Sequence, residues 1–463
     1  MSRLPILALP FAVSLLNNSN KATRVSATAS PTASKQTDCD TIVIGAGAAG
    51  LAAAKTLQAA GRSVLILEAR DRIGGRIKTN YSFAPHPIEC GAEYIQGEHV
   101  HTWSLVRRYG LKSLPLFEQD NKQFMYANQR LLRYSEWSAL PGIAILDLLE
   151  YPPLYTSLSR WVAAGKPDVS LAHFLSIHQV ELSSAIYCLL DRAVSDSYAA
   201  GLDDVGVYGL MELSYEGDGD RNFRLQEGYA HLFEHYAAEL TIQYQSPVTQ
   251  IRWRPSGVTI HTKAGETHTA KTVVVTLPIA MLQQQAVKFD PALPDTKLQA
   301  IHGLRAGAVT KLILRFDQPL WPKDMEYCLT TLDTSTWWRP GWHRPNEAPI
   351  LTAYTGAHNA NRLGALSQNG AVDLALKNLE QMFGRRLSDR LVDALFVDWQ
   401  ADPYSRMAYS YVPVKGHGLR EQLAQPVDSV LFFAGEATHP TRAATVHGAL
   451  ESGIRAAREI LSQ

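Results

Sequence analysis

The segment 40–51 constrains the fold of this chain more than any other. It begins with β-branched residues that predict a strand, and an alanine-rich helix follows three glycines spaced G-x-G-x-x-G: Gly45, Gly47 and Gly50. A second buried strand is predicted at 63–67, and Glu68 stands at its end. In this setting the glycines allow a tight turn, close approach of backbone to a pyrophosphate and close helix–strand packing, while the acid can bind a ribose. The segment therefore predicts a βαβ unit that binds a dinucleotide, and it does not distinguish NAD from FAD.

Charge and composition exclude several classes of protein. Of the 463 residues, 46% are hydrophobic, which is enough for a large core, and the length suggests two or three domains. Lysine plus arginine and aspartate plus glutamate number 44 each, so no net field favours nucleic acid or an anionic membrane. The four cysteines lie far apart without a C-x-x-C, which argues against a metal site or a disulfide framework. No run of about 18 apolar residues predicts a transmembrane segment.

The first 37 residues differ from the rest of the chain because they contain no acidic residue. Leu4–Leu16 is apolar but too short to span a membrane, and Ala27–Ala29 offers an A-x-A cleavage pattern. Residues 1–37 are therefore expected to be a targeting leader, either a secretory signal or an organelle transit segment, or else a disordered tail. A secretory leader would export the protein to a periplasm, a lumen or the exterior, and a tail would leave it in the cytoplasm.

The rest of the chain alternates between helical and strand-rich regions. After an arginine–glycine loop at 69–76, residues 99–216 have mostly helical patterns, including helical apolar spacing from Leu171 to Ser195. Strands are predicted at 241–244, 248–253, 258–262, 272–276, 311–316 and 350–355. Helices are predicted at 229–240 and 372–383, and the last segment, 430–462, reads as strand, glycine turn and long helix. The return of strands after a helical insertion predicts that distant parts of the sequence complete the first domain.

Several specific motifs follow the glycine-rich turn in order. They are E-A-R-D-R-I-G-G-R at 68–76, G-A-E-Y-I-Q-G at 91–97, K-L-I-L-R-F from Lys311, W-x-x-D-P-Y at 399–404, F-A-G-E-A-T at 433–438 and T-V-H-G-A at 445–449. With these motifs the sequence resembles the flavin-containing amine oxidases from about residue 38 to 460. The C-terminal G-E-A-T-H and H-G-A-L-x-S-G make it most similar to the polyamine (spermine) oxidase branch.

The resemblance implies FAD as the cofactor and an α/β fold. A doubly wound, Rossmann-like FAD-binding domain is expected to be interleaved with an α+β substrate-binding domain. Segments 38–98, 217–290 and 396–463 would form the first, and segments 99–216 and 291–395 the second. The substrate would enter between the two domains, where pockets commonly form.

The resemblance also assigns roles toward FAD. Glu68 would hold the adenosine ribose, Val248 would meet the adenine, and Arg76 would lie near the flavin and its phosphates. Glu436 would contact the ribityl–pyrophosphate region, with a simple helix cap as its alternative role. Val446 would open a helix whose N-terminus points at the flavin, where its dipole favours negative charge. The residues expected to contact FAD are Gly45, Gly47, Ala49, Gly50, Glu68, Ala69, Arg70, Gly75, Arg76, Gly91, Ala92, Glu93, Val248, Trp399, Gly435, Glu436, Thr445 and Val446.

Three residues are implied in catalysis. Lys311 matches a lysine that lies under the flavin and holds a water against its reactive ring nitrogen. Tyr409 keeps one of the two aromatic walls over the flavin face, and Thr445 occupies the second position, where enzymes of the spermine-oxidising type also have threonine. Ala408 stands where monoamine oxidases carry a cysteine bonded to the flavin, so FAD is expected to be non-covalent.

Acidic side chains near 91–97 are candidates for binding a cationic substrate. L-amino-acid oxidases place a carboxylate-binding arginine just after this motif, whereas Glu93 offers a group that suits an ammonium ion. The expected substrate contacts are Glu93, Gln96, Glu98 and Trp399. Asp218, Asp220 and the tryptophan cluster at 337–342 would also suit the channel, since aromatic faces attract alkylammonium groups. A packed or partly exposed aromatic patch is the alternative for that cluster.

Together these features predict FAD-dependent oxidation of polyamines, such as spermine and spermidine, by dioxygen. The products would be an aldehyde, a shorter amine and hydrogen peroxide. The alternatives are an L-amino-acid or monoamine oxidase and, from a different class, a flavin-binding scaffold without turnover. The expected partners are a small-molecule amine and dioxygen, with neither nucleic acid nor metal. The sequence does not indicate the oligomeric state or which C–N bond is cleaved.

Overall fold

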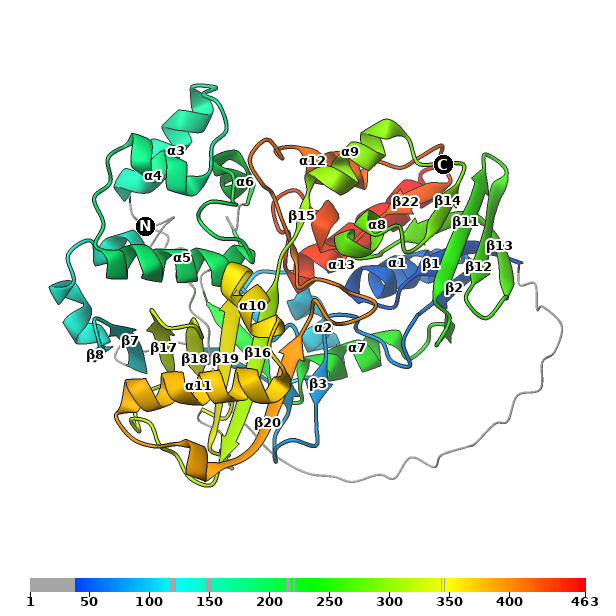
Figure 1. Cartoon of the computed structure of the whole chain (residues 1–463). Helices are drawn as coiled ribbons and strands as arrows, with labels where there is room; N and C mark the ends of the chain where they lie inside the picture. The colour runs from blue at the N-terminus through cyan, green and yellow to red at the C-terminus, as the bar shows by residue number, and fades with distance from the viewer. Residues whose placement is uncertain are drawn as a thin grey trace.

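The structure of the protein is a computed structural model that describes residues 38–116, 122–146, 152–213, 217–219, 221–342, 344 and 346–463 (Figure 1). The expected leader, 1–37, and the candidate channel residue Asp220 lie outside the described residues. Among the described helices, none combines the length and the apolar character needed to cross a bilayer.

A mixed sheet forms around the dinucleotide motif. Its described strands are, in order across the sheet, β10 (Ile242–Gln243), β2 (Val64–Leu67), β1 (Asp38–Ile44), β13 (Thr267–Val275), β12 (Gly257–Thr262), β11 (Val248–Arg254) and β14 (Lys288–Asp290), with β22 (Leu431–Phe433) paired to β13. The strands β10, β2, β1, β13 and β22 run parallel to one another, whereas β12 is antiparallel to both neighbours. Strands from three distant parts of the sequence meet here, which confirms the predicted α/β fold class.

Helices cover both faces of this first sheet. They are α1 (Ala48–Ala59), α2 (Thr102–Tyr109), α7 (Tyr229–Ala237) and α13 (Val446–Leu461) on one face, and α8 (Ile279–Gln283), α9 (Asp295–Gly303) and α12 (Leu419–Ala424) on the other. Successive strand side chains point to opposite faces, so Val43 and Val274 join the first core while Ile42 and Val273 join the second. Burial on both faces explains why these strands read as uninterrupted apolar runs.

Two glycines set the tight packing at the centre of the first core. A Cβ on Gly50 would lie 1.9 Å from the carbonyl oxygen of Gly45, so only glycine lets α1 leave β1 at this angle. A Cβ on Gly453 would lie 2.1 Å from the carbonyl oxygen of Ala49, so α13 can approach α1 closely. The two helices accordingly lie side by side across the parallel strands (Figure 1).

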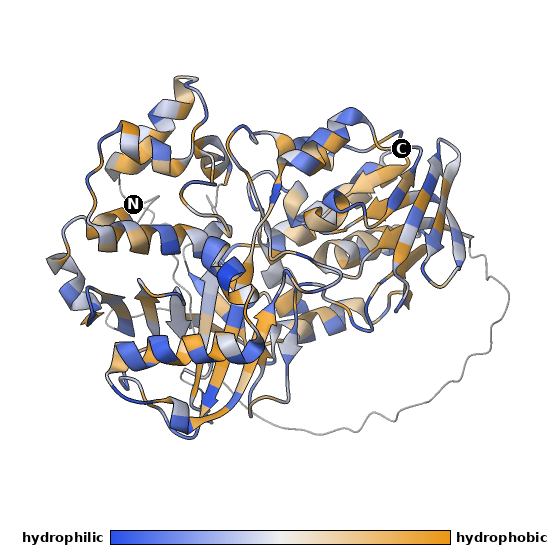
Figure 2. Cartoon of the chain, in the orientation of Figure 1, coloured by the Kyte–Doolittle hydropathy of each residue, from blue (hydrophilic) through white to orange (hydrophobic). Residues whose placement is uncertain are grey.

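A second, mainly antiparallel sheet carries Lys311. Its described strands are, in order, β20 (Leu391–Asp398), β16 (Val309–Phe316), β19 (Ile350–Gly356), β18 (Thr336–Trp338), β17 (Tyr327–Thr330), β7 (Gln123–Ala127) and β8 (Arg130–Arg133). The helix α11 (Gln368–Phe383) packs on one face, and its alternating polar and apolar residues are visible in Figure 2. On the other face lies α5 (Ser184–Tyr198), beside α10 (Ala357–Gly364).

The segment 99–216 is less helical than its sequence suggests. It contributes β7 and β8 to the second sheet and β6 (Ser113–Leu116) to a small antiparallel sheet with β5 (Ile95–Gln96) and β9 (Asn222–Leu225). These strands are short. Over only four or five residues, the alternation of apolar and polar residues expected of a strand is hard to distinguish from helical spacing. The predicted helix 171–195 is in fact two helices, because α4 (Leu171–Ile177) ends before Ser183 caps α5. The insertion also contains α3 (Pro152–Ala163) and α6 (Val207–Glu212).

Several described segments cross the boundaries expected between domains, and one of them is α2, which comes from 99–216 and packs on the first sheet. The strand β20 pairs with β16 as far as Asp398, beyond the expected boundary at 395/396. The helix α9 contributes Ala300 and Ile301 to the core of the first sheet, although the second domain was expected to begin at 291. Strand pairing places β20 and apolar packing places α9, and the periodicity of one segment reveals neither. The short pairs β3 (Thr79–Asn80) with β4 (Ile88–Glu89), and β15 (Arg305–Ala306) with β21 (Ser410–Tyr411), complete the described sheets.

Candidate active site

A cavity of about 570 Å³ is lined by residues of both large sheets and of the C-terminal motifs. All the residues predicted to contact cofactor or substrate line it, with two exceptions. Gly50 lies behind the glycine-rich turn, where it serves helix packing. Glu98 lies off the lining, and its carboxylate accepts a hydrogen bond of 2.6 Å from the Arg221 side chain. The topology thus brings together residues that are more than 400 positions apart in sequence, such as Gly45 and Val446.

The glycine-rich turn and Glu68 form one end of the cavity. Gly45 has a φ of +101°, a conformation that favours glycine. The buried Glu68 carboxylate accepts hydrogen bonds from the backbone N–H of Ala46 at 2.7 Å and of Arg70 at 2.9 Å. A Cβ on Gly47 would meet no atom within 4 Å, so bare backbone at the start of α1 borders open space. An anion can therefore approach the helix N-terminus there.

An ion pair joins the loop after Glu68 to the C-terminal motif. The Arg76 guanidinium donates to Glu436 Oε1 at 2.9 Å and also to the carbonyl oxygen of Ala408. Glu436 further accepts from Ser410 Oγ at 2.7 Å and from the backbone N–H of Ala444 at 3.2 Å. Burial by itself raises the pKa of Glu436, but the Arg76 and Arg420 charges outweigh it and hold this pKa below its ordinary value. The carboxylate is thus a fixed negative charge at the cavity wall.

The N-terminus of α13 also borders the cavity. Thr445 is its N-cap, since its Oγ1 accepts from the Gly448 N–H at 2.9 Å while donating to the Arg442 carbonyl at 2.7 Å. Its hydroxyl is therefore engaged in capping, and its methyl group remains to contact a ligand. Val446 begins the helix, as predicted.

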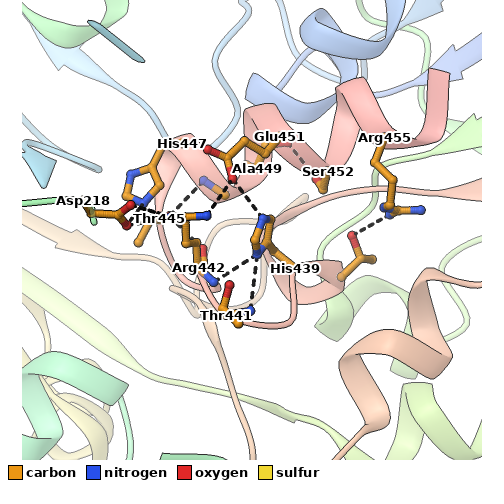
Figure 3. A network of polar contacts seen from close by, with 12 residues as sticks. Asp218, His439, Thr441, Arg442, Thr445, His447, Ala449, Glu451, Ser452 and Arg455 are labelled. Atoms are coloured by element: carbon orange, nitrogen blue, oxygen red, sulfur yellow. Dashed lines mark hydrogen bonds and ion pairs between the residues drawn. The ribbon is translucent and has the colours of Figure 1, made fainter. Parts of the chain in front are cut away.

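A polar network ties this helix end to the loop at 217–219 (Figure 3). The Arg442 guanidinium binds both carboxylate oxygens of Asp218, at 2.6 to 2.9 Å. His447 Nε2 lies 3.8 Å from the same carboxylate, and His439 Nε2 contacts Glu451 at 3.0 Å. Burial lowers the pKa of His447 to about 4, so its imidazole is neutral at physiological pH. Asp218 does line the cavity, but Arg442 neutralises its charge.

Lys311 lies in a buried ionic cluster. Its Nζ donates to Glu93 Oε2 at 2.6 Å and to the carbonyl oxygens of Glu89 and Gly91, each at 3.0 Å. Glu93 Oε1 accepts from the Arg224 guanidinium on β9. Burial alone would raise the pKa of Glu93, yet the two cations hold it below its ordinary value. The carboxylate that was expected to bind substrate already has two cationic partners.

Aromatic side chains line the cavity near Lys311. The Tyr409 hydroxyl donates to the Asp196 carbonyl at 2.7 Å. The Tyr354 hydroxyl lies 2.8 Å from the Tyr409 hydroxyl. Trp338 packs edge-on against Tyr94, with ring centroids 6.3 Å apart. Trp399 also lines this end, and its Nε1 donates to the Cys90 carbonyl at 3.0 Å. Of the tryptophans at 337–342, Trp338 lines the cavity, whereas Trp337 and Trp342 lie off its lining and pack into cores.

Several residues of the site were not identified from the sequence. Among them are Asp196 and Tyr354, which line the cavity, and Arg224, which binds Glu93. Tyr354 lies in a predicted strand and pairs directly with Lys311 across β16 and β19, so the register would have located it had the pairing been known. Arg224 follows a poorly patterned loop, and no local signal distinguishes it from a surface arginine.

A family model described as flavin containing amine oxidoreductase matches residues 48–461. The chain belongs to this family. It is similar to Polyamine oxidase 2 of Arabidopsis thaliana, with 30% identity over 436 residues that cover 90% of this chain and 87% of the relative. It is also similar to Lysine-specific histone demethylase 1 homolog 2 of Arabidopsis thaliana, with 29% identity over 92% of this chain and 59% of that protein.

Solved structures of amine oxidases share the fold. Putrescine oxidase bound to putrescine superposes with a TM-score of 0.76 at 20% identity, and the match covers 93% of this chain and 100% of that structure. Because the chain belongs to a flavin-containing family of amine oxidoreductases, its cofactor is FAD. The cavity fits such a cofactor, because glycine backbone borders it at Gly47 and at Gly435, where an added Cβ would likewise meet nothing within 4 Å.

Proposed function

We propose that this amine oxidase acts on polyamines of the spermine and spermidine type and uses dioxygen as the electron acceptor. The products would be an aldehyde, a shorter amine and hydrogen peroxide. The observation that carries the proposal is the aromatic end of the cavity, where Tyr354, Tyr409 and Trp338 surround a space beside Lys311. Aromatic faces suit a slender alkylamine chain and its ammonium groups. The similarity to plant polyamine oxidases supports the same substrate class.

FAD would lie along the cavity in an extended form. Glu68 would bind the adenosine ribose, Val248 would contact the adenine, and the bare backbone at Gly47 would face the pyrophosphate. The fixed charges of Arg76 and Glu436 would hold the middle of the cofactor, with the α13 N-terminus near its ring. Ala408 carries no thiol, so acid precipitation should release the FAD. The first sheet with its helices would be the FAD-binding domain, and the second sheet with the part of 99–216 beyond α2 would be the substrate-binding domain.

When bound, FAD supplies the acceptor for a hydride from the carbon next to the reacting nitrogen and passes the electrons to dioxygen. The protein orients the amine and excludes water from this step. Tyr409 and the methyl group of Thr445 would flank the reacting C–N bond, with Trp399 as a further wall. Lys311 would contribute a charge below the ring. The iminium product then takes up water and breaks down to the aldehyde and the shorter amine.

Remote ammonium groups of a polyamine need partners other than a free carboxylate at Glu93. Glu93 is paired with two cations and Asp218 with one, and Glu98 is bound to Arg221. Gln96 is exposed and lines the cavity, and its amide oxygen can accept a hydrogen bond from an ammonium group. We propose that Gln96 and the aromatic faces make the direct contacts with these ammonium groups.

Two other substrate classes are consistent with the family. A monoamine or an amino acid would occupy only the aromatic end of the cavity, beside Lys311. The similarity to histone demethylases raises a methylated lysine side chain as a second candidate, although the chain spans only 59% of that relative. A scaffold without turnover would bind FAD but transfer no electrons.

Anaerobic mixing tests the proposal. We expect spermine or spermidine to bleach the yellow colour of the FAD-loaded protein, and admission of air to restore it. Bleaching by tyramine or L-arginine but not by either polyamine would refute the substrate assignment, and no bleaching by any amine would favour the scaffold.

A further inference from the structure

The Lys311 ammonium makes three hydrogen bonds, and each goes to a protein oxygen. The acceptors are Glu93 Oε2 at 2.6 Å and the carbonyl oxygens of Glu89 and Gly91 at 3.0 Å. An ammonium group has three N–H donors, whereas a neutral amine has two and would turn its lone pair toward one of these acceptors. The geometry around Nζ therefore matches the charged form alone.

Glu93 is the carboxylate that links this lysine to a second buried cation. Its other oxygen accepts from Arg224, whose Nη1 donates to the Pro340 carbonyl at 3.1 Å. The side chains of Glu93, Lys311 and Arg224 are each at most 4% exposed. Trp338 lies over Lys311, with 5.4 Å between Nζ and the ring centroid. One carboxylate thus compensates two buried positive charges at the cavity wall.

We propose that Glu93 is a positioning residue that keeps Lys311 as a fixed cation at the cavity wall, so that Lys311 acts through its charge and does not accept a proton. The inference deepens the proposed function and rests on it only where it places the flavin ring beside Lys311. It replaces the expected direct contact between Glu93 and the substrate. It also gives Arg224 a role, because Arg224 holds the second oxygen of the same carboxylate.

Loss of the Glu93 charge has a defined consequence. Lys311 and Arg224 would then lose the one carboxylate that both of them contact, and burial beside a like charge favours the neutral form of a lysine. Arg224 cannot release a proton in this range, so Lys311 is the group that would do so. The other titratable or charged groups around the pair are Glu89, Cys90, Tyr94, Arg344 and Tyr354. Burial raises the pKa of Glu89 to about 7, so this carboxyl group titrates in every variant.

The test uses the FAD-loaded protein in the absence of any amine. The visible spectrum of bound FAD is recorded from pH 6 to 9.5 for the wild type, Glu93→Gln and Glu93→Gln/Lys311→Met. We expect Glu93→Gln to show a new spectral step, with a midpoint at least one pH unit below the ordinary lysine pKa of about 10.4. The double variant should lose this step. Glu347→Gln, which removes a carboxylate paired with Arg339 outside the cavity lining, is the matched control and should follow the wild type.

Two results would overturn the proposal: a Glu93→Gln profile identical to that of the wild type, or a new step that persists in the double variant. If Glu93→Gln does not fold, the proposal is tested by comparing the FAD spectra of the wild type and Lys311→Met over the same pH range. A step in the wild type that Lys311→Met removes would show that Lys311 exchanges its proton despite Glu93, and would refute the proposal; coincident profiles would support it. No amine takes part in these measurements, so a protein that fails to oxidise polyamines refutes the proposed function and leaves this outcome unaffected.

Discussion

The hydroxyl oxygens of Tyr354 and Tyr409 lie 2.8 Å apart, although one belongs to β19 and the other to the loop that follows Trp399. Tyr409 donates its single proton to the Asp196 carbonyl, so Tyr354 must be the donor to Tyr409. Tyr354 also pairs with Lys311 across the sheet. This chain of contacts fixes the Tyr409 ring relative to the lysine, and it joins α5, the second sheet and the C-terminal loop at one point.

Tyr354→Phe should therefore lower turnover without lowering FAD content. The variant keeps the aromatic ring and loses one hydrogen bond, worth about 1 kcal/mol, which corresponds to roughly a five-fold lower kcat/KM. Steady-state peroxide production with spermine measures it. Tyr236→Phe alters a tyrosine buried under the first sheet and is the control. Equal kcat/KM for Tyr354→Phe and the wild type would show that the contact does not orient Tyr409.

Lys311→Met should keep its yellow FAD but lose about 100-fold in turnover, because it removes the charge nearest the aromatic end of the cavity. Rapid mixing with polyamine under anaerobic conditions separates the loss from any effect on oxygen. Lys271→Met changes an exposed lysine that pairs with Asp40, and it should behave as the wild type. If the turnover of Lys311→Met were unchanged, Lys311 would have no role in catalysis.

Activity should rise toward alkaline pH. The reacting nitrogen must be neutral to release a hydride, whereas a free alkylamine, like lysine, has a pKa near 10. Burial raises the pKa of Tyr354 far above its ordinary value, so this phenol stays neutral. Its ionisation therefore does not lower the activity at alkaline pH. A plot of kcat/KM for spermine against pH measures the effect. A flat profile between pH 6 and 10 is inconsistent with this account.

Asp196 should make stability depend on pH. Burial raises the pKa of its carboxyl group from 3.8 to about 7 in the folded protein. A raised pKa stabilises the fold below about pH 4, and this contribution is lost as the pH rises through 7. Asp196→Asn removes the titration, so the variant should gain stability relative to the wild type between pH 4 and 8, by at most about 4 kcal/mol. Unfolding midpoints that change in parallel for both proteins over this range would contradict the assignment.

The sequence predicted the frame of the molecule better than its interior contacts. The strand–glycine–helix unit at Gly45 and the final helix at Val446 were correctly placed, because their spacing and caps are local properties. The strand β9 and the partners of Glu93 were not predicted, because they depend on how segments meet that lie far apart in sequence: Arg224 is 131 residues from Glu93, and Lys311 is 218. Glu93 is an example: the sequence shows that it is acidic, but it does not predict its two buried cationic partners.

One measurement tests the central claim most directly. The purified FAD-loaded protein is offered spermine, spermidine, tyramine, L-arginine and a peptide with a dimethylated lysine, and hydrogen peroxide is recorded against amine concentration. The account predicts that spermine or spermidine gives the highest kcat/KM of the five. A higher value for tyramine, L-arginine or the methylated peptide would contradict the polyamine assignment, and no peroxide with any of them would contradict amine oxidation itself.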